Sequence, residues 1–92
     1  MQLDIVSPEA QLFSGEVNSV TVPGASGSFQ ILNNHAPIVS TLVSGRVKIQ
    51  GDITLDETVK DRFTQEDGQT YFFEITSGAI EMRDNKIILL TD

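Results

Sequence analysis

The chain has 92 residues, no cysteine and a formal net charge of −7. A chain of this length forms one small domain, and the lack of cysteine excludes disulfides and thiolate metal sites. The acidic charge disfavours nucleic acid as a partner, and no apolar run approaches the roughly 20 residues of a membrane-spanning helix.

Apolar residues recur at every second position over much of the chain, which is the period of a strand with one buried face. In the run 46–50, Val47 and Ile49 would face a core while the polar residues face water. The same spacing is present in three earlier pairs: Leu3 and Ile5, Val20 and Val22, and Phe29 and Ile31. Turn residues separate the runs, at Gly15, Pro23-Gly24, Gly27, Gly45 and Gly51. Short strands divided by turns predict an all-β domain, either a sandwich or a barrel.

The segment 52–68 fits two predictions. Its apolar residues are Ile53, Leu55, Val59 and Phe63. Three of them are four residues apart, and Thr54 followed by Glu57 matches a capping box, which predicts a short helix. All four also share one face of an extended strand, and the turn 66–68 would then close a hairpin. We expect either a short helix or an extended hairpin here.

Two later runs carry apolar residues on both faces. Phe72 points away from its apolar neighbours in the run 71–75, and the run 87–90 is apolar at every position. Such strands are covered on both sides, so we expect an internal loop or another protein over the outer face. The alternative is a strongly curved inner strand at the closure of a barrel.

Residue patterns typical of catalysis are sparse. His35 is the only histidine, and without cysteine or a basic neighbour it does not indicate a catalytic triad or a metal site. The turn 24–27 has the glycines of a phosphate-binding loop but lacks the Lys and the Ser or Thr that complete one. The carboxylates within 52–67 do not follow the ligand spacing of a calcium loop. We predict no catalytic, cofactor or metal site.

Three blocks of sequence occur in a distinctive order. They are Val6-Ser7-Pro8-Glu9 with Phe13-Ser14-Gly15-Glu16-Val17, Gly27-Ser28-Phe29-Gln30-Ile31-Leu32 with His35-Ala36-Pro37, and Ser77-Gly78 through to Leu90-Thr91-Asp92. Together they resemble the N-terminal domain of the epsilon subunit of F-type ATP synthases over nearly the whole chain. The resemblance implies one domain at 1–92, a flattened β-sandwich of about ten short strands. It also implies a rotor part that turns with the gamma subunit and stands on the ring of c subunits.

The resemblance implies two sets of contact residues. Those at the c ring would be Gly27, Ser28 and Phe29. Those at the gamma subunit would be Ser7, His35 and Ser40. Gln30 and Asn33-Asn34 stand where the family has Gly and Pro-Gly, so we expect a different fine shape for the ring-facing loop, with asparagines that tolerate positive φ. The segment between Gly51 and Tyr71 is longer than the family's hairpin, and we expect an extra contact or a mobile acidic loop.

The function implied by the resemblance is that of a non-catalytic central-stalk subunit of a bacterial-type, proton-translocating ATP synthase, which couples ion flow to ATP synthesis. We expect a peripheral location at the cytoplasmic face of the bacterial inner membrane, with membrane association only through the complex. Longer family members continue into C-terminal helices that inhibit the enzyme; because this chain stops at Asp92, we expect neither the helical hairpin nor that inhibition. The alternative function is a stand-alone β-sandwich module that binds a peptide or a glycan.

Overall fold

The computed structural model describes residues 1–92 and consists of strands, loops and one turn of 3-10 helix. The strands are β1 (Gln2–Val6), β2 (Gln11–Glu16), β3 (Ser19–Gly24), β4 (Gly27–Leu32), β5 (Ile38–Leu42), β6 (Gly45–Gln50), β7 (Phe63–Asp67), β8 (Thr70–Ile75), β9 (Gly78–Arg83) and β10 (Lys86–Thr91). The 3-10 turn, η1, is Lys60–Arg62. The prediction of an all-β domain of about ten strands is confirmed.

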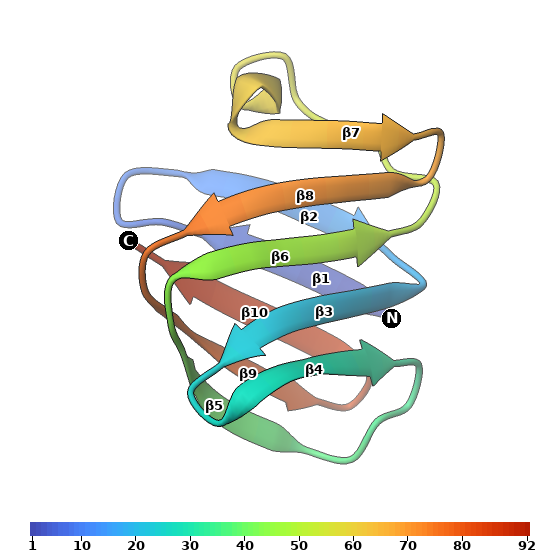
Figure 1. The fold of residues 1–92 in the computed structure, drawn as a ribbon. Coiled ribbons are helices and arrows are strands. Elements are labelled where there is room, and N and C mark those ends of the chain that lie inside the picture. The colour runs from blue at the N-terminus through green and yellow to red at the C-terminus, as the bar shows by residue number, and fades with distance from the viewer.

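All ten strands belong to one sheet that curls into two facing layers (Figure 1). One layer holds β2, β1, β10, β9 and β5, and the other holds β4, β3, β6, β8 and β7. The layers join where Gly24 at the end of β3 pairs with Leu42 at the end of β5. Every pairing is antiparallel except that of β1 with β10. Of the sandwich and the barrel that the turn-divided runs left open, the sandwich implied by the family resemblance is the observed architecture.

The core lies between the layers and is built by the two-residue alternation of the strands. Val47 and Ile49, predicted to face inward, have no exposed surface. The earlier pairs behave alike: Leu3, Ile5, Val20, Val22 and Ile31 are fully buried, and Phe29 is half-buried against the core. Each such side chain contributes roughly 1.5–3 kcal/mol when it is removed from water.

Three non-glycine residues take positive φ, all of them Asn or Asp. Asp84 and Asn85, at φ 53° and 59°, form the two-residue turn between β9 and β10. This turn suits the right-handed twist of paired strands. Asn34 has φ 62°, which confirms that the Asn33-Asn34 pair adopts a turn conformation with positive φ.

The segment before β7 combines parts of both predictions. The hairpin is confirmed in part: β7 pairs with β8 and the chain turns between Asp67 and Thr70, but the strand begins only at Phe63, so Ile53, Leu55 and Val59 lie outside it. The capping box is wrong: Asp56, not Thr54, holds the short turn, by accepting hydrogen bonds from the Thr58 amide at 2.9 Å and its hydroxyl at 2.6 Å. Only η1 is helical here. Local hydrogen bonds alone do not stabilise a longer helix in so short a segment, because most helical stability in proteins comes from packing.

This segment contributes apolar surface to the sandwich. Ile53, Leu55 and Val59 are half-buried and pack against the core. The Tyr71 hydroxyl lies 3.5 Å from the carbonyl oxygen of Ile53, and the Phe63 and Phe73 rings stack with centroids 5.1 Å apart. The expectation of a mobile acidic loop is therefore replaced by a packed segment with acidic residues on its outer side.

The close approach of β9 and β10 leads to a prediction. A Cβ atom at Gly78 would lie 2.5 Å from the carbonyl oxygen of Leu90, which is backbone and is held by the sheet. We expect Gly78→Ala to lower the free energy of unfolding by about 2 kcal/mol. Gly68→Ala is the matched control, because a Cβ there meets nothing within 4 Å and its φ is not positive. Urea unfolding of both variants measures the difference, and equal stabilities would contradict it.

Candidate functional site

The outer side of β5, β9 and β10 exposes a contiguous group of apolar side chains, which we call the apolar face. Its members are Val39, Ala79, Ile88 and Leu90, which line one shallow hollow of about 260 Å³. Val39 is 82% exposed and Leu90 is 51% exposed. Exposed apolar side chains gathered in this way are typical of a surface that meets another protein.

The strand register produces this face. Alternation turns Ile87 and Leu89 of β10 into the core, where they have no exposed surface, and leaves Ile88 and Leu90 outside. Leu90 of β10 pairs with Ala79 of β9. Two residues further along the sheet, Ile88 of β10 and Val39 of β5 face outward on either side of β9. Three adjacent strands therefore contribute to one apolar surface.

The run 87–90 was predicted to be covered on its outer face by an internal loop or by another protein, and the loop alternative is wrong. No loop lies over Ile88 and Leu90, and β10 lies inside a layer, between β1 and β9, instead of at a barrel closure. Phe72 differs, because the Arg46 guanidinium stacks over its ring at 4.0 Å from the centroid. Coverage of the apolar face by another protein stays a prediction.

A polar cluster borders the apolar face on β1. The Asp4 carboxylate accepts hydrogen bonds from the Gln2 amide at 2.9 Å and the Ser14 hydroxyl at 2.8 Å, and lies 3.6 Å from the Lys86 ammonium. The hydrogen bond from Gln2 lowers the pKa of Asp4, with help from Ser14 and Lys86 and against the opposing effect of partial burial. Asp4 pairs in register with Ile88, so charged and apolar surfaces meet there.

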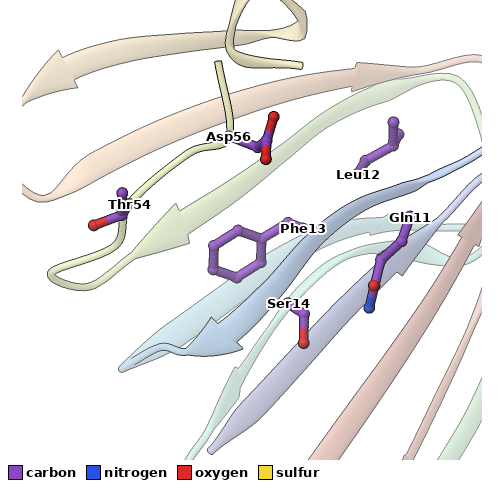
Figure 2. A pocket seen from close by; sticks show the side chains of 6 residues that line it. All are labelled: Gln11, Leu12, Phe13, Ser14, Thr54 and Asp56. Atoms are coloured by element: carbon purple, nitrogen blue, oxygen red, sulfur yellow. The ribbon is translucent and has the colours of Figure 1, made fainter. Parts of the chain in front are cut away.

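A second hollow, of about 220 Å³, lies between β2 and the segment before η1. Figure 2 shows Thr54 and Asp56 on one side of it and the Phe13 ring on the other. The other lining residues are Gln11, Leu12 and Ser14. Asp56 is its only charged side chain and is bonded to Thr58. This lining offers no pair of groups for acid-base or nucleophilic chemistry.

No group of three or more His, Cys, Asp or Glu side chains is placed to hold a metal ion. No helix of the chain has the length and apolar character needed to cross a bilayer.

Comparison with known proteins shows the family. A family model described as ATP synthase, Delta/Epsilon chain, beta-sandwich domain matches residues 1–60. The chain is 43% identical over 90 residues to an ATP synthase epsilon chain of Chlorobaculum tepidum, covering 98% of this chain and 86% of that protein. The chain belongs to the ATP synthase epsilon chain family. An epsilon chain of Caulobacter vibrioides is 37% identical, over 100% of this chain and 90% of its own length. A Leptospira interrogans epsilon chain is also 37% identical, but the chain spans 61% of it.

Two solved assemblies share the fold of this epsilon-family chain. One is the central stalk and c-ring of the Tetrahymena thermophila mitochondrial ATP synthase, with a TM-score of 0.74, 16% identity, and coverage of 98% of this chain and 61% of that one. The other is the OSCP/F1/c-ring structure of the Euglena gracilis mitochondrial enzyme, with a TM-score of 0.73, 18% identity, and coverage of 97% and 48%. The epsilon chain is a subunit of ATP synthase and not its catalytic one.

The residues predicted at the gamma subunit do not form one cluster, and only Ser7 and His35 lie near the ends of the apolar face. Ser7 lies in the turn after β1, where its hydroxyl bonds to Ala10, and directly follows Val6, the partner of Leu90. His35 is exposed in the loop between β4 and β5, near the opposite end of β10, because its neighbour Asn34 bonds to Asn85. Ser40 is half-buried on β5 and pairs with the buried Ile80, so its side chain lies on the opposite face of the strand from Val39.

The residues predicted at the c ring lie at the tip of the β3–β4 hairpin. Gly27 and Ser28 are exposed, and Gly27 has φ 126°, a conformation that favours glycine. Phe29 is half-buried and its ring lies over Gly24, where a Cβ would be 2.7 Å from it. Phe29 thus holds the hairpin to the core, and the exposed atoms of the turn come from the residues before it.

Val39 and Ala79 were not singled out in the sequence. The run 38–42 mixes apolar and hydroxyl residues without a clean alternation, so the exposed side of β5 depends on its pairing with β9. The apolar run of β10 was the available signal, since four apolar residues in succession must leave two on the outer face.

The Asp4 cluster leads to a pH prediction. Because the folded-state pKa of Asp4 is lowered from an unfolded value of about 3.9, the stability it contributes is present above that pH and is lost as the pH falls through the folded pKa. We expect Asp4→Asn to cost about 1 kcal/mol at pH 7, and the gap to wild type to close in strong acid. Urea unfolding from pH 2 to pH 7 measures the gap, with the exposed Glu9→Gln as control. A gap that stays constant with pH would contradict the prediction.

Proposed function

We propose that this chain is a non-catalytic rotor subunit of ATP synthase, which joins the gamma subunit to the c ring and so couples ion flow to ATP synthesis. The observation that carries the proposal is the exposed apolar face on a chain of the epsilon family. Support comes from the two structural neighbours, whose assemblies contain the central stalk or the c-ring. The place in the cell that goes with this role is peripheral, at the cytoplasmic face of a bacterial inner membrane.

The apolar face is the proposed docking surface for the gamma subunit. Its exposed aliphatic side chains would form the buried centre of the interface, where each contributes on the order of 1–2 kcal/mol when covered. Lys86 and Asp4 would lie at its polar rim, where charges influence specificity more than affinity. We propose Ser7 and His35 as contacts at the border of this interface, and Ser40 as a gamma-subunit contact on the other face of β5.

The β3–β4 turn is the proposed contact with the c ring, through Gly27 and Ser28 together with the tip residues before them. The turn is fixed to the strand that carries Val39: the Ala25 amide donates to the carbonyl of Thr41 at 3.2 Å, and the Val43 amide donates to that of Pro23 at 2.9 Å. A close-packed core deforms little under load. The two proposed contact surfaces thus belong to one stiff body, as the transmission of torque requires.

A glycan-binding module has less support. Such modules present exposed aromatic rings to a sugar, whereas every aromatic side chain of this chain is buried or half-buried. The rotor role accounts for the exposed surface, which here is aliphatic.

The functional experiment is removal of this chain from cells that make it. A tagged copy is expected to copurify the gamma and c subunits, and inner-membrane vesicles from cells without the chain are expected to lose ion-driven ATP synthesis. Restoring the gene is the control. Undiminished synthesis in vesicles that lack the chain would contradict the proposed function.

A substitution tests the docking surface. Val39→Asp places a carboxylate on the β5 side of the apolar face but, at 82% exposure, should leave the fold intact. We expect at least about a tenfold loss of binding to the gamma subunit, because the carboxylate must be desolvated on docking. Leu32→Asp is the matched control, since Leu32 is 53% exposed on β4 in the other layer. Isothermal titration measures both, and a loss confined to the Leu32 variant would contradict the assignment.

A further inference from the structure

A single carboxylate, Glu81, lies within the apolar face. Glu81 is exposed on the outer side of β9, directly opposite Val39 of β5 and Ile88 of β10. It lines the hollow formed by the apolar face and two neighbouring hollows, one toward Pro37 and one toward Lys86. A partner that covers the apolar face must therefore also cover Glu81.

Glu81 forms no ion pair with its own chain in this structure. The nearest cations on this face belong to other carboxylates: Arg83 is 3.8 Å from Asp84, and Lys86 is 3.6 Å from Asp4. The Glu81 carboxylate is therefore exposed to water in the free chain and has no ion-pair partner there, although Arg83 and Lys86 line a hollow beside it.

Burial of an unpaired carboxylate opposes docking strongly, whereas burial of one that meets a well-placed cation does not. Aliphatic neighbours on both sides would exclude water from the pair and strengthen it. An arginine is best suited, because its weakly hydrated guanidinium can bond to both carboxylate oxygens.

We propose that the surface docking on the apolar face presents an arginine or lysine that pairs with Glu81, and that this pair fixes the register of docking. The inference rests on the proposed function, which makes the gamma subunit the occupant. Aliphatic contacts alone are non-directional and would allow the partner to slide along the sheet. One buried charge pair makes a single register favourable.

Whether Glu81→Leu weakens or strengthens binding to the gamma subunit tests the proposed ion pair. Glu81→Leu removes the charge and extends the apolar face. If no cation meets Glu81, the variant binds the gamma subunit more tightly than wild type; if a cation does, the variant leaves that cation buried and unpaired, and binding weakens. We expect at least a tenfold weaker binding, measured by isothermal titration. Unchanged or tighter binding would overturn the proposal.

Two further variants and a salt series distinguish loss of the charge from a change of shape. Glu81→Gln keeps the shape and should also weaken binding, whereas Glu66→Gln, on the exposed edge strand β7, should not. The loss caused by Glu81→Gln should change little as salt rises from about 50 to about 500 mM, because a pair from which water is excluded is screened much less than an exposed one. Thermal unfolding of each variant shows whether it is folded, which we expect for substitutions at exposed positions.

The experiments distinguish failure of the proposed ion pair from failure of the proposed docking surface. If Val39→Asp abolishes binding while Glu81→Leu tightens it, the docking face stands and the charge pair is wrong. If neither variant changes binding, the gamma subunit does not use this face, and both the pair and the assigned docking surface are wrong.

Discussion

The pleat of β10 is the constraint on which the structure depends. Side chains of a strand alternate between two faces, so a strand that is apolar at four positions in succession cannot bury them all in one core. Ile87 and Leu89 enter the core, and Ile88 and Leu90 remain outside. Because β10 lies inside its layer, bonded to β1 and β9, neither loss of register nor local unfolding could hide the outer pair without breaking two ladders. The chain thus folds with an exposed aliphatic surface, which we propose another subunit covers.

Rigidity connects this surface to the proposed ring contact. The β3–β4 turn and the apolar face lie on different layers, but the layers meet at the pairing of Gly24 with Leu42 and are tied by backbone bonds from Ala25 and Val43. The segment before β7 adds three half-buried apolar side chains to the same core. A force applied at the turn is therefore transmitted through close-packed atoms and not through a flexible linker.

Much of the fold was predictable from sequence, because alternation depends only on which residues can enter a core. Val47 and Ile49 illustrate this, as does the positive φ of Asn34, which reflects a local preference of asparagine. The form of the segment 52–62 was not predictable, since its turn is held by Asp56 and its apolar residues pack on strands distant in sequence. The candidate site was half predictable: the outer pair of β10 follows from the run itself, whereas Val39 joins it only through the register with β9.

The central claim is that the apolar face is covered in the assembled enzyme. The chain has no cysteine, so a single cysteine reports on one position without background from this subunit. The measurement is maleimide labelling of Val39→Cys in the free chain and in purified ATP synthase, with Leu32→Cys on the other layer for comparison. The account predicts that both cysteines react in the free chain and that only the one at position 39 is protected in the complex. Equal reactivity of position 39 in both states would contradict it.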